Sequence, residues 1–352
     1  MPVTVLGCRY PSPAEFQKLQ MDLLPRYTDN RLAFQLMPFR NTEMPRIQLQ
    51  KPDIFRGMQQ WRGLDKPTQH VRDNWNPFGS LREIDPTYWG EHDDVGEEFL
   101  TTAAMPSGSG LNVIDMTEIV TTRQMRLLER RYNRIEFSDW QALIFGKYEA
   151  LNPQGQVMFS ATYNIQQVSA GIPWSDYANA TPLADFRCIQ LRGRGTSAKF
   201  GVEAKAYMNR VTANCLFKNT NPHDVGKAAL TACCTFMSLD MVNQQFAAQG
   251  LPQLEIYDEG YVDEDENFYP YIPDGYIVVV GTRPGNTPVG NYWYTRNAVG
   301  CSINTGPWMK LVDTCEREVP RRITIFDGHN GGPVINYPRQ LVVFRTGCTN
   351  QC

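Results

Sequence analysis

The residues of this chain that most readily supply acid–base or metal chemistry are its four histidines, His70, His92, His223 and His329. None of them belongs to an H-x-x-x-H pair or accompanies a paired C-x-x-C pattern, the spacings that bring zinc ligands together. His92 precedes Asp93 and Asp94, which could touch a divalent ion, although a solvated loop explains this run better. Neither His223 nor His329 has a serine or cysteine partner at a spacing typical of nucleophilic catalysis. The histidines therefore predict neither a metal site nor a catalytic centre.

Two further segments resemble ligand-binding loops but lack the residues those loops require. The acidic run DEGYVDEDEN at 258–267 has no glycine at its sixth position and no correctly spaced terminal glutamate, so it is not a calcium loop. The segment LRGRGTSAKFG at 191–201 has no G-K-[ST] and follows a predicted helix, whereas a phosphate-binding loop follows a strand. The chain also has no G-x-S-x-G motif and no signature of a catalytic thiol. We predict that it is not an enzyme and uses no cofactor.

The amino-acid composition is that of an ordinary globular protein. The 352 residues are 42% hydrophobic and 20% charged, with a formal net charge of −3, which argues against disorder and against a dedicated nucleic-acid binder. We find no apolar run long enough to span a bilayer and no secretory signal, so we expect synthesis in the cytosol and no membrane partner. The 24 prolines and 27 glycines are spread through many turns, which favours an α+β fold with irregular loops over a helical bundle.

The nine cysteines are odd in number, which with cytosolic synthesis predicts that no disulfide framework is built into the fold. Four lie in apolar, helical contexts and are interpreted as small buried hydrophobic residues: Cys188, Cys215, Cys233 and Cys234. Three others differ because they lie in the terminal tails: Cys8, Cys348 and Cys352.

A long amphipathic helix is predicted within 117–150. Its apolar stripe and its basic face are separate, because each set recurs every three or four residues. The stripe contains Val120, Leu127, Leu128, Tyr132 and Ile135, and the basic face contains Arg123, Arg126, Arg130 and Arg134. The basic face could be solvated, could form ion pairs between subunits or could face a polyanion. The alternation with Glu129 and Glu136 favours ion pairs. A hairpin follows, LIFGKYEAL and QVMFSATYNI, with its turn at 152–155.

The preceding region, 46–110, has weak signals for regular structure. Trp61, Trp75 and Trp89 stand there among prolines, glycines and charges of both signs. Loops of this length are usually functional, and tryptophans at this density suggest a surface that a partner buries. The alternative is that these rings complete the chain's own core.

Residues 207–290 are predicted to form a rigid wedge. A short helix opens on Asn209, a second runs from caps at Asn221 or Asp224 to Gly250, and an acidic hairpin separates two strands. Upstream, Thr181 and Pro182 open a helix that Gly193 closes. No part of this segment is arranged like a catalytic centre, so it suits a chain that packs against copies of itself.

Several of these blocks resemble a known family. YMNRVTANCLF resembles the "MNR.TAN.L" block of tailed-phage major capsid proteins of the lambda coat-protein E family. GLPQLEIYDEGY and IPDGYIVVVGTRPGNTPVG are similar to later blocks of that family, and PLADFRCIQL is similar to the preceding helix. The similarity runs in order from about Arg31 to Gly347. Two departures are a longer, more aromatic stretch over 64–96 and the two cysteines of the tail GCTNQC.

The resemblance implies an α+β, Hong Kong 97-like phage capsid fold with an axial domain, a peripheral domain with a long spine helix, an N-terminal arm and an extended loop. On this chain it implies five segments: arm 1–45, extended loop region 46–116, peripheral domain with spine helix 117–170, axial domain 171–315, and peripheral strands with the C-terminal tail 316–352. The three tryptophans then become inter-subunit contacts of the extended loop, and the four arginines the basic face of the spine helix.

The function implied is that of a major capsid protein of a tailed bacteriophage, found in the virion and assembled in the host cytoplasm. Copies would form pentamers and hexamers of an icosahedral head around double-stranded DNA, without sequence-specific binding. Expected partners are a separate scaffolding protein, the portal and a cement or decoration protein. The alternatives are an encapsulin-like cellular compartment and, less favoured, a soluble hydrolase.

If the chain is part of a virion, two states of the tail cysteines Cys8, Cys348 and Cys352 are equally favoured. They could form inter-subunit disulfides after the particle leaves the reducing cytosol, or they could stay free.

Overall fold

The computed structural model describes residues 3–5, 8–10, 28–50, 81–103, 114–151, 154–196, 198–221, 238–283, 285, 287–298, 303–314 and 320–348. The chain divides into two compact units, each assembled from three stretches of sequence. Unit 1 is Met1–Ile47, Asp85–Asp139 and Tyr292–Pro333, and unit 2 is Gln48–Ile84, Trp140–Asn291 and Val334–Cys352. These ranges differ from the five segments that the resemblance implies, and those segments stay a prediction. None of the described helices is long and apolar enough to cross a membrane.

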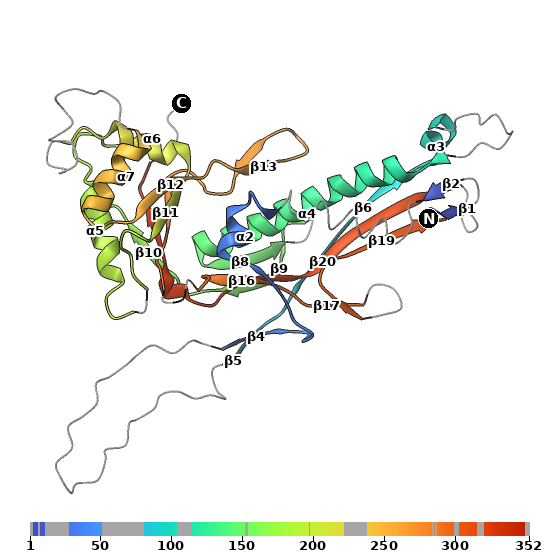
Figure 1. The fold of residues 1–352 in the computed structure, drawn as a ribbon, viewed down its shortest axis with the longest axis horizontal. Helices are drawn as coiled ribbons and strands as arrows, with labels where there is room; N and C mark the ends of the chain where they lie inside the picture. The colour runs from blue at the N-terminus through green and yellow to red at the C-terminus, as the bar shows by residue number, and fades with distance from the viewer. Residues whose placement is uncertain are drawn as a thin grey trace, which may run out of the picture. The chain divides into compact units, whose positions relative to one another are not determined.

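The main sheet of unit 1 is centred on one long strand (Figure 1). Its path is β19 (Trp308–Asp313), β20 (Ile323–Ile335), β16 (Gly290–Tyr294) and β3 (Phe39–Asn41), and β6 (Thr87–Val95) also pairs with β20. The β6–β20 ladder is antiparallel and runs from Val95 opposite Ile323 to Thr87 opposite Gly331. The sequence had suggested little regular structure for 46–110, yet its C-terminal part contributes this nine-residue strand.

Unit 1 also contains shorter elements. They are β1 (Val3–Val5), β2 (Cys8–Tyr10), α2 (Leu32–Leu36), α3 (Glu97–Ala103), β7 (Ile114–Asp115), β17 (Arg296–Asn297) and β18 (Asn304–Thr305). Strands β1, β2 and β7 make a three-stranded sheet, and β17 pairs with β18. Strands β4 (Ile47–Gln50) and β5 (Leu81–Ile84) pair with each other at the two ends of the segment 51–80, which lies outside the described residues.

Helix α4 (Thr117–Phe145) confirms the predicted long helix. Its apolar stripe is buried, and Val120 and Leu127 pack in one cluster with Val95, Ile323 and Ile325. The helix ends because Gly146 takes a φ of +65°, a conformation that L side chains disfavour. The residues LIF at 143–145, predicted to begin the hairpin, are therefore the last turn of the helix. The hairpin itself is β8 (Lys147–Leu151) and β9 (Val157–Thr162).

Unit 2 is built on a five-stranded mixed sheet. The strand order is β10 (Gln166–Ser169), β21 (Leu341–Arg345), β15 (Tyr276–Val280), β11 (Lys205–Met208) and β12 (Gln253–Ile256). Figure 1 shows three helices beside this sheet, α5 (Pro182–Arg192), α6 (Arg210–Lys218) and α7 (Leu239–Ala248). Their apolar faces and the sheet form one core that includes Trp174, Phe186, Phe246 and Phe344.

The predicted helix signals of unit 2 are confirmed in part. Pro182 is the first residue of α5 and Gly193 its C-cap, although the Thr181 side chain makes no capping hydrogen bond. Asn209 caps α6 by accepting from the Thr212 amide. Helix α7 begins after Ser238, which caps it; the predicted helix start near 221–224 leads into residues 222–237, which lie outside the described part. The remaining elements are β13 (Gly260–Val262) and β14 (Phe268–Pro270), the predicted acidic hairpin, and the short 3-10 helix Pro338–Gln340.

Candidate functional site

The basic face of α4 is occupied within unit 1 by strand β6. Arg123 forms an ion pair with Asp93 and donates to the Asp94 carbonyl at 3.2 Å. Arg130 makes two hydrogen bonds to Glu91, from Nε to Oε2 at 2.6 Å and from Nη2 to Oε1 at 3.1 Å. The run His92-Asp93-Asp94, which could have touched a metal ion from a loop, is thus part of strand β6. The carboxylates of Glu91 and Asp93 on this strand neutralise the charges of Arg130 and Arg123.

Trp89 joins the same surface. Its indole lies 5.0 Å from the Arg134 guanidinium, a cation–π distance, and its Nε1 donates to the Thr87 hydroxyl at 2.9 Å. Thr87 in turn donates to the Gly331 carbonyl on β20. The ring is half-buried on its own chain, and the inter-subunit contact predicted for Trp89 stays a prediction. Trp61 and Trp75 lie outside the described residues, and Arg126 is exposed on α4.

On another side of α4, a buried ion pair ties the helix to β20. The Arg131 Nη1 lies 2.5 Å from the Asp327 Oδ1, and the two side chains are only 6% and 4% exposed. Burial raises the pKa of Asp327 to about 7, and the Arg131 guanidinium opposes that rise. A buried pair of this kind is costly to break but contributes little net stability, because both ions lose their hydration.

Other polar groups are buried in the same unit. His329 lies beside Tyr292, with 2.9 Å between the ring Nε2 and the tyrosine hydroxyl, and burial lowers the pKa of His329 to about 3. Asp139 has no hydrogen-bond partner for either oxygen within the described residues. Burial, with a contribution from Glu136, raises its pKa well above the ordinary value. Glu136 itself accepts from Arg31 at 2.8 Å. His329, one of the sequence candidates, is therefore a neutral core residue.

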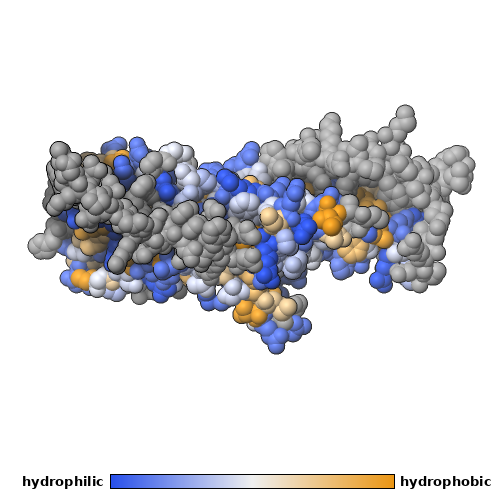
Figure 2. All heavy atoms as spheres, turned by 90° about the horizontal axis from the view of Figure 1, so that it is seen from below, coloured by the Kyte–Doolittle hydropathy of each residue, from blue (hydrophilic) through white to orange (hydrophobic). Residues whose placement is uncertain are grey.

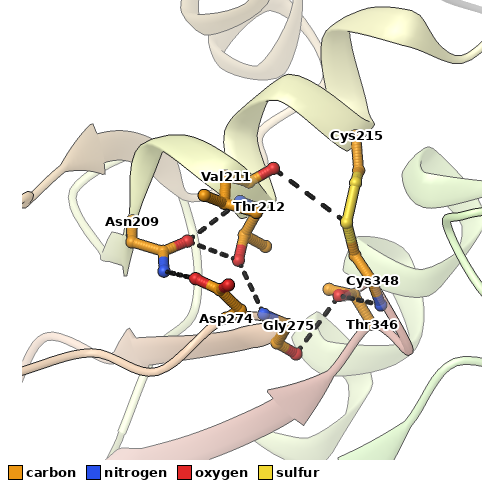
Figure 3. Close-up of a disulfide and its surroundings, with 8 residues drawn as sticks. All are labelled: Asn209, Val211, Thr212, Cys215, Asp274, Gly275, Thr346 and Cys348. Atoms are coloured by element: carbon orange, nitrogen blue, oxygen red, sulfur yellow. Dashed lines mark hydrogen bonds between the residues drawn. A yellow bond between two sulfur atoms is a disulfide. The ribbon is translucent and has the colours of Figure 1, made fainter. Parts of the chain in front are cut away.

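Two of the sequence blocks that resemble the capsid family meet in unit 2, around the start of α6 (Figure 3). Asn209 Oδ1 accepts from the Thr212 amide at 2.9 Å and from its hydroxyl at 2.7 Å, while Asn209 Nδ2 donates to Asp274 Oδ1 at 2.6 Å. Thr212 Oγ1 accepts from the Gly275 amide at 2.9 Å. The side chains of Asn209 and Thr212 thus join the segment YMNRVTAN to the segment IPDGY, although the bonded residues are more than 60 positions apart. The cap of α6 positions both side chains.

The C-terminal segment completes this cluster. The Thr346 amide donates to the Gly275 carbonyl at 2.8 Å, and the Cys348 amide donates to Thr346 Oγ1 at 3.2 Å. A Cβ on Gly275, which has a φ of +78°, would clash with the Cys348 carbonyl oxygen. Only glycine therefore allows the tail to approach so closely.

Cys348 forms a disulfide with Cys215 of α6 (Figure 3), which corrects three sequence-based expectations. A disulfide is part of the fold, Cys215 is not simply a buried hydrophobic residue, and Cys348 is paired within the chain and not with a neighbour. The reason is local: after β21, Gly347 with a φ of +68° returns the tail over α6. The Cys8 side chain, Cys233, Cys234 and Cys352 lie outside the described parts. Cys188, expected to be buried, is exposed and free on α5.

Exposed apolar side chains gather at hairpin tips in unit 2. Figure 2 shows one face of the molecule, where scattered hydrophobic patches interrupt a mainly hydrophilic surface. The β8–β9 hairpin exposes Leu151, Val157 and Met158, the last at 72%, and the β13–β14 hairpin exposes Val262, Phe268 and Tyr269. Apolar groups at the ends of rigid hairpins are suited to contacts with other protein surfaces.

A shallow hollow lies in unit 1, and its lining contains no acid–base or nucleophilic arrangement. Its volume is about 220 Å³, and it is lined by Pro45, Pro86, Tyr88, Thr295, Arg296, Asn297, Ala298 and Ile303. Across the residues that the structure describes, no group of three or more His, Cys, Asp or Glu side chains could hold a metal ion.

A family model described as phage major capsid protein E matches residues 76–299, which is more than half of the chain. The chain belongs to this family. It is therefore a structural subunit of a phage head shell, and the resemblance drawn from the sequence blocks is confirmed. Comparison with curated proteins finds no match.

Solved structures show the same fold. A putative prophage capsid protein from E. coli CFT073 is 13% identical, with a TM-score of 0.53 over 93% of this chain and 98% of that one. A phage-related protein from Bordetella bronchiseptica RB50 is 9% identical, with a TM-score of 0.51 over 96% and 98% of the two chains. At such low identities the similarity establishes the α+β phage capsid fold and nothing finer.

Proposed function

We propose that copies of this chain form the pentamers and hexamers of an icosahedral phage head around double-stranded DNA. The family match over 76–299 carries this proposal. The head assembles in the host cytoplasm with a separate scaffolding protein, a portal and, where present, a decoration protein. The DNA is enclosed without sequence-specific recognition, in keeping with the net charge of −3. The subunit has a structural role and no enzymatic one.

The physical basis of assembly is many weak contacts repeated by symmetry. The exposed apolar tips of the β8–β9 and β13–β14 hairpins would be buried between neighbouring subunits. Each contact is small, but closure of a shell makes the contacts mutually reinforcing. The ion pairs between α4 and β6 lie within one subunit, so they join these two elements and leave the hairpin tips for contacts between subunits.

The test is assembly of hairpin variants. Met158→Asp places a charge on a side chain that is 72% exposed, so it should leave the fold intact and abolish rapidly sedimenting particles. Glu203→Gln, in the exposed turn before β11 and outside both hairpins, serves as the control and should assemble normally. Circular dichroism verifies folding of both variants. Particles that form equally well with Met158→Asp would remove the β8–β9 tip from the proposed interface, and no particles from the wild-type chain with its scaffold would refute the function.

Nuclease-resistant DNA distinguishes a phage head from an encapsulin-like compartment. A phage head purified from its native source should contain DNA that survives nuclease treatment, whereas a compartment should contain cargo protein.

A further inference from the structure

The strongest feature that head formation does not explain is the covalent link between α6 and the C-terminal segment. Cys215 and Cys348 are 133 residues apart in sequence, with Cα atoms 6.6 Å apart, a separation that disulfides span. The two residues are 6% and 1% exposed. The link therefore lies inside unit 2, where no neighbouring subunit can exchange with it.

The surrounding hydrogen bonds position the two sulfurs without needing the bond itself. Thr346 donates to the Gly275 carbonyl from both its amide, at 2.8 Å, and its hydroxyl, at 3.2 Å. The Cys348 amide then donates to Thr346 Oγ1. The Cys348 sulfur lies 4.0 Å from the Val211 carbonyl oxygen, so a reduced thiol would have an acceptor there. Figure 3 shows these contacts converging on the disulfide. A reduced chain would hold the same geometry with two opposed thiols.

The compartment sets the redox state. Cytosolic glutathione and thioredoxin keep thiols reduced, whereas released virions meet an oxidising medium. We propose that Cys215 and Cys348 stay reduced while the head assembles and become an intrachain disulfide after release, locking the C-terminal segment onto α6. This inference rests on the proposed function, because it requires assembly inside a cell and survival outside it.

The oxidant is a small-molecule disulfide. One protein thiolate attacks it, forming a mixed disulfide and releasing one thiolate. The second cysteine then attacks the protein sulfur of the mixed disulfide, forming the S–S bond and expelling the second thiolate. The two protein thiols lose two protons and two electrons, and the small disulfide is reduced to two thiols.

Burial makes this oxidation slow. A reagent can reach Cys348 only when residues 346–348 detach from Gly275, which is a local opening of unit 2. Cys188, exposed on α5, needs no opening. Cys188 should therefore react with a thiol reagent at least about tenfold faster than Cys348 in the reduced chain.

The experiment is thiol trapping on the native protein. Cells producing heads are quenched in acid, and both these cells and released particles are then treated with N-ethylmaleimide in denaturant so that buried thiols also react. Peptide mass spectrometry then compares the two samples. We expect Cys215 and Cys348 to be alkylated in the cellular sample and linked to each other in released particles. Cys188 should be alkylated in both. A linked peptide already present in the cellular sample, or alkylated Cys215 and Cys348 in the released sample, would overturn the proposal.

A stability measurement tests the lock separately. Reductant should lower the temperature at which released wild-type particles disrupt, and it should have the same effect on Cys188→Ser particles. Cys215→Ser particles should disrupt at the lower temperature with or without reductant. Trapping on the wild-type chain needs no variant, so a misfolded Cys215→Ser subunit would not remove the test. If reductant leaves the disruption temperature of intact particles unchanged, the proposed lock is wrong but the proposed function is not. If no particles form, both the proposed function and the lock are wrong.

Discussion

Breaking the buried Arg131–Asp327 ion pair should destabilise unit 1 far more than replacing the whole pair. Both side chains are at least 94% buried and their nearest atoms are 2.5 Å apart. Arg131→Met removes the cation and leaves Asp327 buried without it, which we expect to cost about 3–5 kcal/mol. Because burial already raises the pKa of Asp327 to about 7, that carboxyl will take up a proton near neutral pH, which places this variant at the lower end of the range.

The reverse variant and the double variant give the decisive comparison. Asp327→Leu leaves the guanidinium, which cannot be neutralised by losing its proton, so its cost should approach about 5 kcal/mol. The double variant Arg131→Met/Asp327→Leu should lie within about 2 kcal/mol of the wild type, because no buried charge remains. Arg126→Met, on the exposed part of the same helix, is the matched control and should change stability by less than about 0.5 kcal/mol.

The assay is hydrogen exchange across a urea series, read on peptides from 117–139 and 323–333, the parts of α4 and β20 that belong to unit 1. The two single variants should open at lower urea concentrations than the double variant. If the double variant instead lost the sum of the two single costs, the residues would be acting independently and the burial argument would be wrong.

Three further perturbations have defined outcomes. Burial raises the pKa of Asp139 above its ordinary value of 3.8. The folded state therefore holds this proton more tightly than the unfolded state, and the free energy of unfolding falls as the pH rises above about 4. Asp139→Asn should flatten this decline in the urea midpoint, and an unchanged slope would show that Asp139 is not the group responsible. Gly275→Ala should lower the melting temperature of the chain, whereas Gly285→Ala, which has a φ of +80° but whose added Cβ would meet only the Thr287 hydroxyl oxygen at 4.0 Å, should lower it less. Asn209→Ala removes both a helix cap and the Asp274 hydrogen bond, so it should cost more than Ser238→Ala, about 2 against 1 kcal/mol by urea unfolding.

Local signals in the sequence predicted much of unit 2. Thr181-Pro182 and Asn209 marked helix starts that the structure has, because caps act within one turn of the chain. The α4 helix was equally clear from its periodicity, but its end was misplaced. Only the positive φ of Gly146 shows that LIF belongs to the helix, since an apolar triplet suits a helix end and a strand start alike.

Long-range partners could not be read from local patterns. The arginine face was visible, yet its carboxylate partners lie on β6, about 30 to 40 residues earlier. Cys215 and Cys348 are separated by 133 residues, and cysteine spacing does not determine pairing. The Asn209 cluster was indicated only by resemblance of its blocks to a family. In each case the sequence does not show which distant segments lie side by side, and only the folded structure does.

Electron microscopy of the native particle fraction that contains this chain tests the central claim most directly. We expect DNA-filled icosahedral shells whose repeating subunit density fits this α+β fold in pentamers and hexamers. A small, slowly sedimenting species in the native source, with no shell containing the chain, would contradict it.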